Sequence, residues 1–179
     1  AVYGTWSNAG SFTPDDTEAF VRAIYAVSGR DMSLFANSGN HDDDFALEPP
    51  EGCICIEDRI YVHQGIRILG LGGSYRYRKG NNMFTEAQMG LRILRQKPKL
   101  WRSGGIDILV THAPARHIND FETLTHRGFE CFVRLLDQYR PKYFVHGHIH
   151  KNYGPGIPER SVYHGTTIIN ASGRYVFEY

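Results

Sequence analysis

The alternation of strand-like and helix-like segments in the middle of this sequence constrains its fold more than any other feature. Short apolar runs typical of strands occupy residues 66–71, 106–110 and 142–146, and amphipathic stretches typical of helices separate them. Strands that alternate with helices form a largely parallel sheet that those helices cover. Residues 162–169 and 174–179 have no helix between them, and we expect them to form a closing antiparallel pair. The sequence therefore predicts an α/β fold with a substantial antiparallel component.

Three segments carry the signals of helices. Residues 13–29 begin with a capping threonine, a proline and two acidic residues, which suit the positive end of a helix. A second helix is expected to begin after Thr85 and to run to Leu94, because Pro98 would terminate it. A third is expected over residues 127–139, where apolar side chains recur along one stripe.

Size and composition are those of an ordinary globular protein. The 179 residues are expected to form one domain, 1–179, and a hydrophobic content of 41% argues against disorder. Twenty basic residues against nineteen acidic ones give a net charge of +1, which provides no electrostatic footprint for nucleic acid or an anionic membrane. The longest apolar run, 23–27, is far short of the ~20 residues that cross a bilayer. Neither kind of partner is therefore expected from composition.

The cysteines indicate the cellular compartment. There are three, and two of them stand two residues apart on an expected strand, so a disulfide framework is not favoured. The N-terminus also has no secretory signal pattern. We therefore expect a reducing, cytoplasmic environment.

Three expected strands end in small residues followed by side chains that can bind metal. The segments are Gly39-Asn40-His41-Asp42, Thr111-His112-Ala113-Pro114 and Gly147-His148-Ile149-His150. In α/β sheets, ligands bind outside the carboxyl ends of the strands, so these segments can meet at one place. Imidazole nitrogens and an amide oxygen suit a divalent ion such as Zn, Mn or Fe. The pattern predicts a metal site to which the following residues contribute: Asn40, His41, His112, His148 and His150.

These three motifs, in this order and spacing, resemble those of the calcineurin-like metallophosphoesterases. The resemblance covers about residues 39–170 and is to small bacterial members of that superfamily. It implies a four-layer αββα sandwich with a two-metal site at the strand ends. It also implies that Asn40, His112 and His148 hold one metal and that His150 belongs to the other.

The resemblance further implies a metal-dependent hydrolysis of phosphomonoesters or phosphodiesters. Two divalent cations, Mn, Fe or Zn, can clamp the attacking and leaving oxygens of an in-line displacement and supply a hydroxide near neutral pH. By the same resemblance His41 is the acid that protonates or stabilises the leaving oxygen, and Asp42 orients it. Because His41 is not a metal ligand in this arrangement, it can stay protonated beside the Asp42 carboxylate.

The N-terminal part of the chain departs from the family pattern. The family has an Asp-x-His pair on its first strand and then a Gly-Asp whose carboxylate bridges the metals, whereas this chain has Gly10 followed by Ser11. No Asp-x-His occurs upstream of Asp42, and residues 1–36 match the family poorly. The first strand is therefore expected to be missing or altered. The chain is a fragment, an imperfectly assigned sequence or a diverged protein, and as written it is expected to bind one metal tightly.

Further residues near the motifs have open roles. His146 precedes the last motif, and a structural role is favoured for it. His126 can approach the site or face solvent, and the two are equally supported. Arg116 and His117 can meet a phosphate, although a solvated loop is favoured. Arg76 belongs to a basic, aromatic segment that forms either a phosphate-binding lip or an exposed loop.

Two other functions compete with catalysis. A binding or scaffold module would keep the fold and one metal but lose activity, because Ser11 cannot replace a bridging carboxylate. A structural metal site is ranked last, since asparagine is a poor ligand for structural zinc and no thiolate is nearby. The residues do not distinguish among phosphoester substrates or fix the oligomeric state.

Overall fold

The structure is a computed structural model, which describes residues 2–3, 34–36, 53–80, 82–150, 156–172, 175–177 and 179. The helix expected over residues 13–29 lies outside the described residues. So do Ser11 and the motif that carries Asn40, His41 and Asp42.

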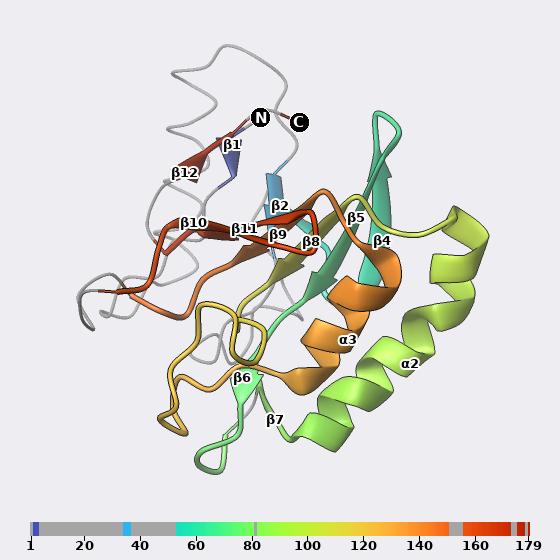
Figure 1. The fold of residues 1–179 in the computed structure, drawn as a ribbon. Coiled ribbons are helices and arrows are strands. Elements are labelled where there is room, and N and C mark those ends of the chain that lie inside the picture. Colours follow the sequence, from blue (N-terminus) through green and yellow to red (C-terminus); the bar gives the residue numbers. More distant parts are fainter. Residues whose placement is uncertain are drawn as a thin grey trace.

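A six-stranded mixed sheet forms the centre of the molecule (Figure 1). Its inner strands are parallel to one another, and its two edge strands pair with them antiparallel. This confirms the α/β fold with an antiparallel component. In spatial order the strands are β10 (Arg160–Tyr163), β11 (Thr166–Asn170), β9 (Tyr143–His146), β8 (Ile108–Thr111), β5 (Ile66–Leu71) and β4 (Arg59–His63).

The C-terminal strands differ from the prediction. Residues 162–169 do not form one strand, because His164 and Gly165, with φ of 46° and 88°, turn the chain into a β10–β11 hairpin. Positive φ at both central residues is typical of the turns that match the twist of paired strands. The last strand, β12 (Tyr175–Val176), pairs instead with β1 (Val2–Tyr3). The closing pair predicted over 162–169 and 174–179 was therefore wrong.

Apolar side chains alternate between the two faces of the central sheet. Leu69, Leu109, Phe144 and Ile168 stand in register across four strands and pack toward the helices. Their chain neighbours Ile68, Ile108, Val145 and Ile169 form a second apolar cluster, which the C-terminal residues Tyr175 and Phe177 join. A parallel sheet buried on both faces requires cover on both sides. The sheet is thus an inner layer of the fold.

In the part of the chain that the structure describes, three short two-stranded pairings accompany the central sheet. Besides β1 with β12, they are β2 (Leu34–Ala36) with β3 (Cys53–Cys55) and β6 (Ser74–Tyr75) with β7 (Met83–Phe84).

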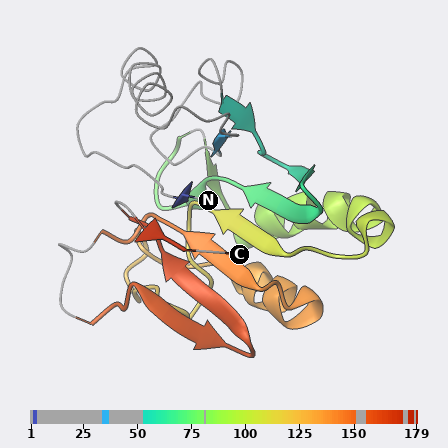
Figure 2. The same cartoon turned by 90° about the horizontal axis from the view of Figure 1, so that it is seen from above.

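Helices α2 (Glu86–Ser103) and α3 (Glu130–Tyr139) lie side by side on one face of the sheet (Figures 1 and 2). Thr85 caps α2 as predicted and forms a capping box with Gln88. The predicted end of this helix at Leu94 was wrong, because α2 continues through Pro98. The ring of Pro98 faces solvent, while Leu100 in the next turn is fully buried and holds that turn on the sheet. No described helix combines the length and apolar composition that spanning a membrane requires.

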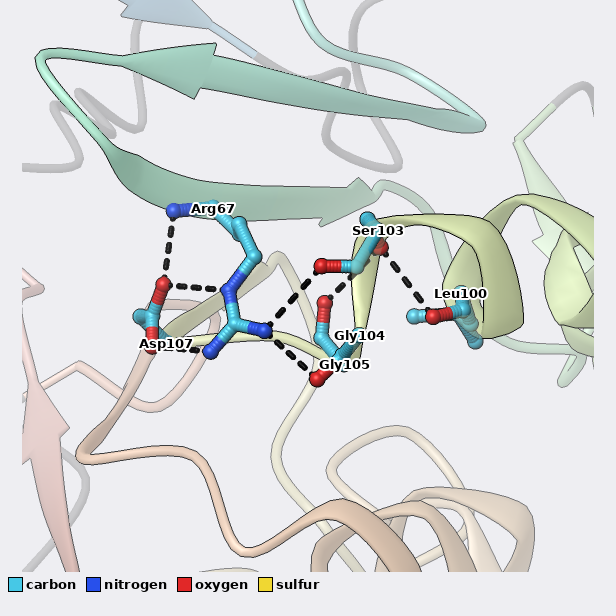
Figure 3. A network of polar contacts seen from close by, with 6 residues as sticks. All are labelled: Arg67, Leu100, Ser103, Gly104, Gly105 and Asp107. Carbon is cyan, nitrogen blue, oxygen red and sulfur yellow. Dashed lines mark hydrogen bonds and ion pairs between the residues drawn. The ribbon is translucent and has the colours of Figure 1, made fainter.

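Arg67 ties the end of α2 to two strands of the sheet (Figure 3). Its guanidinium forms two hydrogen bonds with the Asp107 carboxylate, at 2.7 and 2.6 Å, and donates to the carbonyl oxygens of Ser103 and Gly104. The Asp107 carboxylate also accepts from the Arg67 backbone N–H at 2.8 Å. Because Arg67 donates to it, the pKa of Asp107 is held below its ordinary value.

Asp107→Asn is expected to lower the free energy of unfolding at pH 7 by roughly 1–3 kcal/mol, since it removes a charge-assisted pair. A carboxyl group whose pKa is lower in the folded than in the unfolded state stabilises the fold at pH values above its unfolded-state pKa. That contribution is lost as the pH falls through the folded-state pKa. The difference between wild type and variant should therefore shrink below about pH 4. Urea unfolding at pH 7 and pH 3 measures this difference in the free energy of unfolding. The control is Asp137→Asn, at a more exposed position. A gap that persists unchanged at pH 3 would contradict the assignment.

Candidate functional site

His112 and His148 meet at the carboxyl ends of two neighbouring parallel strands. His112 directly follows β8, and His148 follows β9 after a single glycine. Their rings are 4.8 Å apart, and His112 Nε2 lies 3.1 Å from His148 Nδ1. Two of the predicted ligands thus converge, from segments 36 residues apart in the chain.

Backbone hydrogen bonds fix this arrangement. Gly147 N donates to the His112 carbonyl oxygen at 3.1 Å, which joins the two loops directly. The side chain of Asn170, the last residue of β11, donates to the Ile149 carbonyl oxygen at 2.9 Å. His148 has a φ of 63°, a left-handed conformation that costs a residue other than glycine about 1–3 kcal/mol. Strain of this kind persists where the surrounding structure holds a side chain in a required position.

The proton on His148 is placed by a carbonyl oxygen. His148 Nε2 lies 2.8 Å from the Thr125 carbonyl oxygen, which can only accept a hydrogen bond. Nε2 therefore carries the proton in the neutral ring, and the lone pair of Nδ1 is directed toward His112. Metal-binding histidines characteristically donate their second ring nitrogen to such an acceptor, which fixes the tautomer.

The spacing of the two nitrogens fits a shared cation. Nitrogens about 2.0–2.1 Å from one ion are about 2.9–3.4 Å apart for right-angle to tetrahedral geometry, a range that includes the observed 3.1 Å. Among the residues that the structure describes, no group of three or more histidine, cysteine or carboxylate side chains could hold a metal. The third ligand proposed for this ion, Asn40, lies outside them, as do His41 and Asp42.

His150 follows His148 by two residues and belongs to the same region of the molecule. It is partly buried, and its charge contributes to lowering the pKa of His126, after the larger effect of burial. The role predicted for His150 toward a second metal stays a prediction.

The structure places His126 beside the site, which the sequence alone left undecided. The His126 and His148 rings are 5.8 Å apart. His126 Nδ1 lies 3.0 Å from the Thr123 hydroxyl and 3.1 Å from the Thr125 hydroxyl, which orient the ring. No sequence motif marks His126, and only its position before the third helix indicated an approach to the site.

A buried arginine holds the loop that carries His126. Arg116 is 7% exposed and forms ion pairs with Asp120 at 2.8 Å and with Glu122 at 2.5 Å. Asp120 also accepts from the Gly128 backbone N–H at 2.9 Å, so both ends of the loop are tied together. The prediction that Arg116 lies on a solvated loop was wrong, because its side chain is buried. The two carboxylates compensate the buried charge. The sequence signal for this buried ion-paired arginine was the presence of acidic residues four and six positions after it, Asp120 and Glu122.

The other residues with open roles are placed as follows. His146 is completely buried in β9, and burial lowers its pKa to about 4, so the ring is neutral at physiological pH. This burial agrees with a structural role. His117 is mostly exposed. Arg76 donates to the Met83 carbonyl oxygen at 3.1 and 3.2 Å and so holds the loop between β6 and β7, while Arg127 lies over the Tyr75 ring at 5.3 Å.

Arg116→Met is expected to lower the free energy of unfolding by about 3–5 kcal/mol, because the Asp120 carboxylate would stay buried without its partner. Arg134→Met is the matched control. It breaks an exposed ion pair with Glu86, and the expected cost is at most about 1 kcal/mol. Chemical denaturation of both variants measures the difference. Equal losses would show that Arg116 does not hold the loop.

Comparison with known proteins identifies the family and the fold. The sequence matches the calcineurin-like phosphoesterase family over residues 6–152. No curated protein sequence matches it. The fold is similar to the crystal structure of TT1561 of Thermus thermophilus, with a TM-score of 0.58 and 13% identity, over 90% of this chain and 71% of that one. The predicted metallophosphoesterase fold is thereby confirmed. Since the family match covers most of the sequence, the chain belongs to the calcineurin-like phosphoesterase family.

Proposed function

We propose that this protein is a metal-dependent phosphoesterase that hydrolyses a phosphomonoester or phosphodiester. The observation that carries the proposal is the pairing of His112 and His148. Two imidazoles from adjacent strand ends point ring nitrogens at each other, and a carbonyl oxygen fixes one tautomer. Family membership supports a phosphoesterase-type function.

The residues divide into ligands and proton-transfer groups. His112 Nε2 and His148 Nδ1 would bind one divalent cation, with Asn40 as the third ligand, and His150 would serve a second. Bound Mn, Fe or Zn supplies a nucleophilic hydroxide and stabilises charge on the phosphoryl oxygens. His41 donates a proton to the leaving oxygen, and Asp42 orients His41 and keeps it charged.

We also propose that His126 contacts the substrate, because its ring lies 5.8 Å from that of His148. Its ring is oriented by two threonine hydroxyls and is adjacent to His148. A phosphate oxygen near the metal ligands would lie within reach of this side chain. The compartment proposed for the reaction is the cytoplasm.

A second candidate function is a one-metal binding or scaffold module of the same fold. Ser11 favours it, because a hydroxyl cannot neutralise or space two cations as a bridging carboxylate does. Calorimetric metal titration tests how many metal ions the chain binds. Wild type is expected to bind one equivalent tightly, and Ser11→Asp to raise occupancy. Two tight equivalents in wild type would contradict the one-metal assignment.

The phosphoesterase proposal is tested on p-nitrophenyl phosphate and bis-p-nitrophenyl phosphate with Mn²⁺, Fe²⁺ or Zn²⁺. Hydrolysis should require added metal, stop on chelation and recover when the metal is restored. The exposed variant His164→Asn serves as control, and its activity should equal that of wild type. Activity that survives chelation would contradict the proposal. So would a chain that binds metal but hydrolyses neither ester, which would favour the binding module.

A further inference from the structure

We propose that the outer face of helix α2 is a docking surface for an anionic lipid bilayer. The net charge of +1 predicts no such contact, but the charge is unevenly distributed. Helix α2 contains five basic residues and only one acidic residue. Four of the five basic residues face outward, and the fifth is Arg92. The proposal concerns only this helix and does not depend on the catalytic site.

An apolar stripe runs along the solvent side of α2, opposite its buried face. Its members recur every three or four residues, as side chains on one helix face do, and all are exposed. The large ones are Leu91, Leu94 and Trp101, which are 46%, 54% and 83% exposed. The stripe consists of Ala87, Leu91, Leu94, Pro98 and Trp101. Figure 1 shows α2 at the periphery of the molecule, where its outward face can meet a flat surface.

Basic side chains flank this stripe on both sides. At 100° per residue, Arg95, Lys99 and Arg102 lie along one margin and Lys97 along the other. All four are exposed, and none forms an ion pair with a residue that the structure describes. The fifth basic residue, Arg92, points inward and pairs with Glu57 and Asp58.

The acidic group of the helix does not offset this charge. Glu86 accepts hydrogen bonds from the backbone N–H groups of Glu130 and Cys131 at the start of α3, and it also pairs with Arg134. The outward face of α2 therefore combines apolar side chains with uncompensated positive charge. This is the pattern of helices that lie in the interface of an anionic membrane.

Charge and shape favour a bilayer over other occupants. A second copy of this helix would bring like charges together. Nucleic acid would match the charge, but its phosphate backbone offers nothing to Leu91, Leu94 and Trp101. Three large apolar side chains are too few for the roughly 1,000 Å² that a specific protein interface needs. On a bilayer, the stripe would enter the interface, where tryptophan is preferred, and the long basic side chains would reach lipid headgroups.

Vesicle flotation tests the proposal with the full chain. Phosphatidylcholine vesicles with about 30% phosphatidylserine should bind it, pure phosphatidylcholine vesicles should not, and about 0.5 M NaCl should release it, because salt screens surface charge. Each basic residue near an anionic surface is worth about fivefold in partitioning, so Arg95→Gln with Lys99→Gln should weaken binding about 25-fold. Leu94→Gln with Trp101→Gln should abolish it.

The matched control lies on the opposite edge strand. Val162, 69% exposed, and exposed Arg160 offer one apolar and one basic side chain on β10, so Val162→Gln with Arg160→Gln should bind as wild type does. Circular dichroism would verify that every variant is folded. Equal binding by the α2 variants and wild type would overturn the assignment of this face. No binding to the anionic vesicles would overturn the proposal and make an acidic protein helix the better occupant.

Discussion

Replacing His148 with asparagine is expected to weaken metal binding by more than about 100-fold. Loss of a residue that only hydrogen-bonds to a metal ligand already weakens binding by up to about 100-fold, and His148 is proposed as a ligand itself. Phosphoester hydrolysis should fall below detection with it. The reason is that His148 Nδ1, which faces His112 Nε2 at 3.1 Å, is one of the two nitrogens proposed to bind the cation. Asparagine is chosen because it tolerates the left-handed φ of 63°, so the backbone need not change. Calorimetric titration and the p-nitrophenyl phosphate assay give the two readings.

His117→Asn is the matched control for this prediction. His117 also has a left-handed φ, 60°, but its side chain is 63% exposed and pairs only weakly with Glu122, at 3.4 Å. Its replacement should leave metal affinity and turnover unchanged. If His117→Asn and His148→Asn lost metal equally, the effect would arise from loop structure and not from a lost ligand. Unchanged affinity in His148→Asn would remove His148 from the site.

His41→Ala is expected to lower turnover by roughly 10²–10⁴ while metal content stays the same, because it removes a proton-transfer group and no ligand. Asp42→Asn should cause a milder loss, since it removes only the orienting charge. Steady-state kinetics and elemental analysis on the same preparations give both quantities.

The chemistry of the leaving group provides the control for His41. A substrate whose leaving alcohol has a low pKa needs little protonation, so His41→Ala should lose less activity on a nitrophenyl ester than on an alkyl phosphate. If His41→Ala instead lost its metal, His41 would be a ligand and the role assigned to it would be wrong.

The sequence was sufficient for the parts of the fold that local pattern determines. The strand over residues 66–71 was predicted with both of its ends, because an apolar run stands between the Gln64-Gly65 turn and a glycine-rich stop. The positions of His112 and His148 at strand ends followed from the same patterns. Parallel neighbours then place such ends at one edge, so their convergence could be expected.

The errors arose where tertiary packing overrides a local signal. Pro98 predicted a helix end, but burial of Leu100 on the sheet side offsets the cost of the missing hydrogen bond, so that α2 continues past the proline. The helix instead ends at Gly104, which caps it in a left-handed conformation with φ of 75°. That glycine stands in the sequence six residues after Pro98.

Long-range partners could not be predicted at all. The contact between His148 Nε2 and the Thr125 carbonyl oxygen joins residues 23 positions apart. No periodicity encodes it, yet it decides which nitrogen of His148 can bind a metal. The burial of Arg116 likewise depends on how its loop folds back, because Asp120 and Glu122 compensate the charge only in that conformation.

Anomalous diffraction from a crystal of the Mn²⁺-loaded chain, recorded across the manganese absorption edge, shows whether His112 and His148 bind one metal ion. We expect one strong peak that His112 Nε2 and His148 Nδ1 both coordinate, with Asn40 completing the ligand set. A manganese peak elsewhere, with the two histidines still in contact only with each other, would contradict it.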